Sequence, residues 1–373
     1  MAESDSSRIG SLSNVRSFSM AIVALTVGTL ALKYANEIFI PIAISIIISY
    51  ALDPVVSMFA RWNVPRSVTA AVLLLGIVGG VGWTVYTLRD DAATVLERIP
   101  AAARKFRQAL RENDGKGPGA IEKIKKAAGE LEKTAAEATK SENPLPANTA
   151  RVQVVEESIK LSDYLWIGSM GMMTAAGQVL MILFLVYFIL SSGDLYKRKL
   201  VKIVGPSMSQ KRLSIEILDE INAKVQRFLL VQIFTGVVVA VASWLAFHWL
   251  GLEQAAVWGI AAGLFNSIPY FGPVLVAAGV AIVGFLQFGT LYGVAMLVGV
   301  ALLITSLEGY LLTPWLMGRA AQMNAVAVFV GLLFWGWVWG AWGMFLAVPI
   351  LVGVKVVCDH LEEFKAIGEL LGE

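Results

Sequence analysis

A polar interruption in a long apolar stretch is the first feature of this chain that could do chemistry. The stretch LFNSIPYFGPVL places Asn266, Ser267, Pro269, Gly272 and Pro273 among apolar residues. Inside a helix, Pro costs roughly 3 kcal/mol and Gly nearly 1 kcal/mol, so helix stability does not explain this string. An amide, a hydroxyl and backbone groups freed by a helix break are suited to bind a small polar solute reversibly.

The second chemical candidate is a single acid in an apolar segment. Between Phe228 and Gly318 there is no Lys or Arg, and the acids are Glu253, in a short turn, and Glu308, in ALLITSLEGYLLTPWLMGR. An ionisable group in a membrane helix is costly and usually functional, and desolvation favours the neutral carboxyl, which suits proton exchange. The alternative is a static ion pair between Glu308 and Arg319.

Enzyme catalysis is not indicated by any set of residues. His248 and His360 lie near the ends of apolar segments, and Cys358 is the only cysteine. The chain has no Ser/His/Asp or zinc-ligand cluster. It also has no phosphate-binding glycine loop, so ATP is not expected to drive the protein directly. We therefore predict a chain that is not an enzyme, with no catalytic residue, no metal site, no cofactor and no nucleic-acid partner.

The composition identifies the elements that position these residues. Of 373 residues, 57% are apolar and 16% are charged, whereas about 25% are charged in an ordinary soluble domain. Since a helix needs about 20 apolar residues to cross a ~30 Å hydrocarbon core, the sequence predicts an all-α polytopic membrane protein. About six full transmembrane helices are expected, near 18–32, 38–59, 68–88, 167–190, 228–250 and 291–312.

Two further apolar regions are interrupted and predict broken-helix hairpins. The first, 255–288, has only about 14 residues before Pro269, or roughly 21 Å of helix, which does not cross the membrane. The second, 325–357, has Gly340 and Gly343 near its centre. Each hairpin follows a full span and the two spans run in opposite directions, which is the layout of an inverted transporter repeat.

The second apolar region, 325–357, could instead form one continuous helix, and its central tryptophans have two possible roles. A single long tilted helix from 325 would place the C-terminus, with Lys355 and Lys365, on the outer side and contradict the charge bias. The tryptophans of the cluster could anchor the hairpin at an interface or line a pocket; they are Trp335, Trp337, Trp339 and Trp342. Pro349 lies in the second half of this region, and we expect the solute site to form between the two breaks.

Lys and Arg in short loops predict the orientation. The 193–227 loop has eight Lys or Arg against four Asp or Glu, so it and both termini are expected in the cytoplasm, with 89–166 outside. The expected division is 1–88, an N-terminal membrane region; 89–166, a small, mostly helical extracytoplasmic segment; 167–192, a transmembrane helix; 193–227, a cytoplasmic amphipathic segment; 228–290 and 291–357, the two transport repeats; and 358–373, a cytoplasmic tail.

Several motifs together resemble the autoinducer-2 exporter family, a family of bacterial permeases. The first is Ile268-Pro269-Tyr270-Phe271-Gly272-Pro273, the second is Glu308 and Gly309 followed by Pro314 and Gly318, and the third is WGAWGMFLAVPILV with Gly340, Gly343 and Pro349. The similarity covers about residues 18–360. Ala325 departs from the pattern, because members often have Pro there.

The resemblance implies export or exchange of a small solute across the bacterial inner membrane. It also implies a homo-oligomer, for which a pentamer is one candidate, and the Gly and Ala on the helices would provide close-approach surfaces. Three functions stay open: a secondary transporter of a small polar solute resembling autoinducer-2, coupled to an ion gradient; a monovalent cation/proton antiporter that uses Glu308; and a membrane scaffold that does not transport.

Overall fold

The computed structural model describes residues 19–20, 22–113, 161–193, 208–317 and 323–372, together with Leu195 and Lys199. The named elements within these ranges are all helices. Much of the predicted extracytoplasmic segment, residues 114–160, and part of the predicted cytoplasmic loop lie outside the described residues, as do Gly318 and Arg319.

Seven helices in the described part of the chain are long and apolar enough to cross a membrane. This confirms a polytopic helical membrane protein. The spans are Asn36–Ala60, Arg66–Thr94, Met173–Ser192, Lys211–Trp249, Phe271–Phe288, Leu291–Met317 and Ala325–His360. They belong to helices α2 (Asn36–Ala60), α3 (Arg66–Asn113), α5 (Leu161–Ser192), α7 (Met208–Trp249), α9 (Phe271–Phe288), α10 (Leu291–Leu307) with its continuation, and α12 (Ala325–His360).

Two helices are longer than their expected membrane spans. The predicted amphipathic segment before 228 and the span after it form one continuous helix, α7, because no Pro or Gly separates them. Similarly, α3 continues from its apolar part through charged residues to Asn113. Of the predicted first span, 18–32, the structure describes an apolar helix over Ile22–Tyr34, and several residues before it lie outside the described part of the chain.

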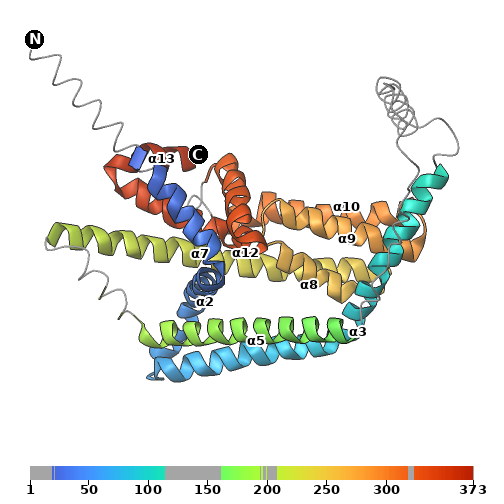
Figure 1. Cartoon of the computed structure of the whole chain (residues 1–373), viewed down its shortest axis with the longest axis horizontal. Helices are drawn as coiled ribbons and strands as arrows, with labels where there is room; N and C mark the ends of the chain where they lie inside the picture. The colour runs from blue at the N-terminus through green and yellow to red at the C-terminus, as the bar shows by residue number, and fades with distance from the viewer. Residues whose placement is uncertain are drawn as a thin grey trace, which may run out of the picture.

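The helices form two packed groups, which meet through α12 and through direct contacts of α3 with α9 and of α2 with α7. Along one side of the molecule α2, α3 and α5 share a buried cluster that includes Val56, Ala70 and Val186, and Figure 1 shows α3 and α5 running side by side. On the other side α7 packs with α8 (Ala255–Phe265), α9 and α10 around Val239, Phe247 and other apolar side chains. Both α2 and α7 contribute to a cluster with α12, which therefore links the two groups.

The C-terminal residues close the base of α12. A short 3₁₀ turn, Glu362–Phe364, leads into α13 (Lys365–Leu371), which packs back on α12. The backbone N–H of Asn324 donates to the Leu371 carbonyl at 3.0 Å, so the residue that caps the start of α12 is tied to the end of the chain. Both ends of α12 are therefore held together.

Candidate functional site

The first break lies between α8, which ends at Phe265, and α9, which begins at Phe271. Tyr270 has φ 65° and ψ −47°, and the N–H of Phe271 donates to the Pro269 carbonyl at 2.7 Å. These angles and this hydrogen bond define the positive-φ form of the γ-turn, which is rare and strained for a residue with a side chain. The chain thus turns sharply at Tyr270, as the proline and glycine string predicts.

Pro273 and Gly272 allow α9 to begin directly after this turn. Pro273 stands in the first turn of α9, where backbone N–H groups have no partner within the helix, so its missing donor costs little. A Cβ at Gly272 would lie only 1.9 Å from the Phe265 carbonyl oxygen. Glycine is therefore required here, because the end of α8 and the start of α9 approach each other within backbone distance.

The tip of the first break carries polar groups that are available for binding. The Gln232 amide of α7 donates to the Asn266 backbone carbonyl at 3.0 Å, which ties the tip to the middle of α7. The side chains of Asn266 and Ser267 are half-buried, and within the described part of the chain neither has a hydrogen-bond partner. A half-buried amide and hydroxyl without protein partners are suited to exchange water for a polar solute.

Aromatic side chains join the first break to α12. The ring of Phe271 stacks on that of Phe329 with centroids 6.3 Å apart, and Tyr270 meets the same ring edge-on at 6.0 Å. Aromatic pairs at these separations contribute about 0.5–1.5 kcal/mol beyond the area they bury. The polar tip is therefore packed against the first half of α12.

The second break is a reversal of direction at Gly340 within α12. Gly340 has φ 61° and ψ −141°, angles that are accessible almost only to glycine. A Cβ at Gly331 would lie 2.4 Å from the Leu351 side chain, although residues 20 apart in a continuous helix are about 30 Å apart. A Cβ at Gly343 would similarly meet the Trp335 carbonyl at 1.8 Å, so α12 is a hairpin rather than one long tilted helix.

The tryptophans at the second break differ in burial and in contacts. Trp339 is buried and its indole N–H donates to the Leu32 carbonyl at 2.9 Å, which fixes the tip to the N-terminal helix. Trp337 and Trp342 are more than half exposed, and the Lys33 ammonium lies 3.8 Å from the Trp337 ring centroid. The two expected roles, interface anchor and pocket lining, stay predictions.

Contacts with α7 give the relative direction of the two hairpins. The α8 helix begins just after α7 ends, and its tip at Asn266 reaches back to Gln232 in the middle of α7. The second half of α12 ends at His360, whose Nε2 lies 3.2 Å from a Glu220 carboxylate oxygen early in α7, and it shares a buried cluster with Val225. The first hairpin therefore reaches the middle of α7 from its C-terminal end, and the second half of α12 lies against the N-terminal part of α7.

The predicted site residues are not all brought together. Asn266, Ser267, Pro269, Gly272 and Pro273 form one group at the first break. The second group, Gly340, Gly343 and Pro349, packs on the N-terminal helix and α2 instead. Gly340 is eleven residues beyond Phe329, which corresponds to about 16 Å along the helix.

Glu308 lies where α10 ends and a π-helical turn, Glu308–Leu312, begins. The Thr313 hydroxyl donates to the Glu308 carboxylate, and the Thr313 N–H donates to the Glu308 backbone carbonyl. π-Helical turns are rare and occur frequently at functional sites. Gly309 lies within this turn, and Pro314 lies in the short helix α11 (Thr313–Met317) that follows.

The packing of α10 on α9 gives the relative direction of these two helices. A Cβ at Gly284 of α9 would touch Leu297 of α10, and a Cβ at Gly293 of α10 would touch Phe288 of α9. These contacts define an antiparallel register of α9 and α10, and the π-turn at Glu308 packs on α7. The predicted partner Arg319 is outside the described residues, while Arg227 of α7 donates to the Leu316 carbonyl at 3.4 Å just beyond the π-turn.

Sequence reasoning missed three parts of the site: Gln232, Phe329 and Thr313. The sequence does contain a pattern that could have identified Gln232. Its amide interrupts the apolar string FLLVQIFTG, as the amide of Asn266 interrupts its own apolar string. Phe329 is one of many aromatic residues in apolar segments, so only the three-dimensional packing identifies it. Thr313 becomes relevant only through the π-turn, which turns its hydroxyl toward Glu308.

The chain matches the family model described as AI-2E family transporter over residues 20–363. It is 24% identical to AI-2 transport protein TqsA of Escherichia coli K12 over 342 residues, 92% of this chain and 91% of that protein. It is 27% identical to the putative transport protein YrrI of Bacillus subtilis 168 over 337 residues, covering 87% of each chain. The putative transport protein YueF of the same Bacillus strain is 32% identical over 174 residues, 46% of each chain.

Proposed function

Because the chain belongs to the AI-2E transporter family, we propose that it is a secondary transporter that moves a small polar solute across the bacterial inner membrane and binds it at the first helix break. One observation carries the proposal: the first of two broken helices lies against the middle of α7 and presents the half-buried side chains of Asn266 and Ser267, which have no partner among the described residues. In transporters, broken helices expose backbone groups to a solute at mid-depth in the membrane.

The opposed hairpins support an inverted repeat. The unit α7–α8–α9 has a spanning helix followed by a hairpin, and α10 with α12 repeats this order with the hairpin pointing the other way. Two such units can expose a central site to either side of the membrane by moving against each other. The Phe329 contact would then be one of the places where the two units meet, in addition to the packing of α9 on α10.

The chemistry at the first break favours an uncharged polar solute. Asn266 offers an amide donor and acceptor and Ser267 offers a hydroxyl, while Tyr270 and Phe271 provide aromatic surface. Side chains of this kind bind hydroxylated small molecules through several neutral hydrogen bonds. A sugar-like solute such as autoinducer-2, for which a relative is named, fits this chemistry.

A cation/proton antiporter is the second candidate, and Glu308 is the observation that favours it. Its half-buried carboxylate accepts a hydrogen bond from the Thr313 hydroxyl at a π-turn. Water entering from one side would favour the charged carboxylate, and closure would favour the neutral form. This cycle also serves a proton-coupled solute transporter, so Glu308 is proposed as the coupling residue in either case.

Flux measurements on the purified chain in liposomes test the proposal. The protein would be reconstituted and offered a panel of labelled polar solutes, including autoinducer-2, and separately Na⁺ and K⁺, with and without a pH gradient. Saturable solute flux that a gradient drives uphill is expected. Cation flux without any solute flux would select the antiporter, and no flux of either kind across the panel would contradict both functions.

A further inference from the structure

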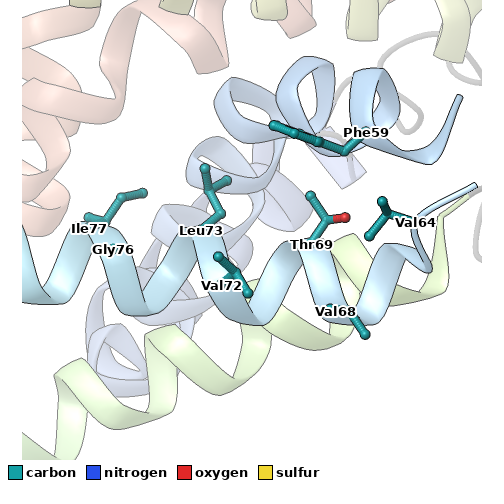
Figure 2. A pocket seen from close by; sticks show the side chains of 8 residues that line it. All are labelled: Phe59, Val64, Val68, Thr69, Val72, Leu73, Gly76 and Ile77. Carbon is teal, nitrogen blue, oxygen red and sulfur yellow. The ribbon is translucent and has the colours of Figure 1, made fainter. Parts of the chain in front are cut away.

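An apolar groove runs along the outside of the α2–α3 hairpin, away from both helix breaks. It has a volume of about 460 Å³, and its lining, drawn in Figure 2, consists of Phe59, Val64, Val68, Thr69, Val72, Leu73, Gly76 and Ile77. A volume of this size is in the range of sites that bind small molecules. The Thr69 hydroxyl, the only polar side-chain group among these residues, donates to the Pro65 carbonyl, so the groove surface offers no unpaired polar group.

The groove begins at the membrane surface and runs inward. One end lies at the turn between α2 and α3, where Phe59 and Val64 flank the turn residues, and the other end lies near Ile77. From Arg66, where α3 begins, to Ile77 the helix rises about 16 Å, close to the depth of one leaflet of a ~30 Å hydrocarbon core. An occupant that fills the groove would therefore extend from the interface to about mid-membrane.

The turn at the mouth of the groove has residue types that can bind a charged lipid head group. Trp62 is 69% exposed and packs edge-on against Phe59 with ring centroids 5.4 Å apart, as expected of an aromatic anchor at the interface. Arg61 is exposed, whereas the guanidinium of Arg66 is already engaged by Asp53. Among the described residues of this turn, Arg61 therefore supplies the positive charge that is available at the mouth.

From this combination we propose that the groove is a phospholipid site, in which one acyl chain lies along α3 and an anionic head group binds Arg61 beside Trp62. The apolar lining matches an acyl chain and its length matches one leaflet. The positive charge selects an anionic head group, because each Lys or Arg near the surface contributes about 1 kcal/mol to anionic lipid binding. This site is independent of the proposed solute pathway.

Filling the groove tests the acyl-chain part of the proposal. Gly76 lines the groove, and a Cβ added at this position would have nothing within 4 Å, so Gly76→Leu occupies the space without a clash. Gly299 of α10 is also a helix glycine whose added Cβ would have nothing within 4 Å, and Gly299→Leu is the matched control. Native mass spectrometry of the detergent-purified proteins with added phosphatidylglycerol or phosphatidylcholine counts the lipids that remain bound.

The wild-type protein and Gly299→Leu are expected to retain one more tightly bound phosphatidylglycerol per chain than Gly76→Leu. Should Gly76→Leu fail to fold, Val72→Phe fills the same groove from a side chain that is 64% exposed. Arg61→Gln is expected to lower the preference for phosphatidylglycerol over phosphatidylcholine about fivefold, with Arg212→Gln, an exposed cation on α7, as its control.

Two results would overturn the proposal. One is equal lipid retention by Gly76→Leu and Gly299→Leu. The other is a lower oligomeric mass for Gly76→Leu with its bound lipid unchanged, which would identify the occupant as a second copy of the chain.

Discussion

Adding one methyl group at Gly272 should separate the two halves of the first hairpin. The Cβ of Gly272→Ala would lie 1.9 Å from the Phe265 carbonyl oxygen, about 1.5 Å short of ordinary contact at 3.4 Å. Overpacking of this kind costs about 1–3 kcal/mol, and the higher helix propensity of Ala recovers at most about 1 kcal/mol. We therefore expect the free energy of unfolding to fall by on the order of 1–2 kcal/mol, with a larger proportional loss of transport because the break residues shift.

Gly299→Ala is the matched control for this prediction. It makes the same change in a helix where nothing lies within 4 Å, so its stability should stay equal or rise slightly. Unfolding by SDS in mixed micelles and solute flux in liposomes would be measured on both variants. Wild-type stability together with wild-type flux in Gly272→Ala would refute the claim that the close approach of α8 and α9 shapes the site.

Three further predictions concern the second break, coupling and topology. Gly340→Ala forces a side chain into φ 61° and ψ −141° and should lower the free energy of unfolding by about 1–3 kcal/mol; SDS titration measures this, and an unchanged value would mean that the reversal tolerates any residue. Glu308→Gln fixes the neutral form, so it should keep downhill solute exchange and lose accumulation driven by a pH gradient; undiminished accumulation would remove Glu308 from the mechanism. In a Cys358→Ala background, a cysteine replacing Gln210 should react with a membrane-impermeant reagent only from the cytoplasmic side, and labelling of intact cells from outside would reverse the proposed topology.

The sequence predicted the membrane fold and both breaks because those features follow from local chemistry. Long apolar segments specify spanning helices wherever they occur, and Pro269 with Gly272 marks a point that a helix cannot cross unchanged. The reversal at Gly340 was also predictable, since glycine is the residue that accepts its backbone angles. Helix ends were less predictable: α7 continues through the expected boundary at 228 because nothing in that stretch interrupts a helix.

The assembly of the site was less accessible from sequence because it depends on contacts between distant helices. The Asn266 backbone carbonyl accepts a hydrogen bond from the side chain of Gln232, 34 residues earlier, and the first break packs on Phe329 rather than on the residues around Gly340. Periodicity shows that an aromatic residue lies in an apolar segment without showing which helix it meets. The joint placement of the two breaks as one solute site therefore stays a prediction, to be tested by transport.

The most direct test of the account removes the polar groups at the first break without changing its backbone. In the double variant Asn266→Leu, Ser267→Ala, the amide and hydroxyl are lost while Pro269, Tyr270 and Gly272 keep the turn. Since these half-buried groups have no protein partner in the described part of the chain, stability should be equal or higher, because removing such groups does not break a bond. Solute flux by the reconstituted variant should fall by at least about tenfold, the effect of losing roughly 1.4 kcal/mol of binding. Flux at the wild-type rate in a stable variant would contradict the central claim that the solute binds at this break.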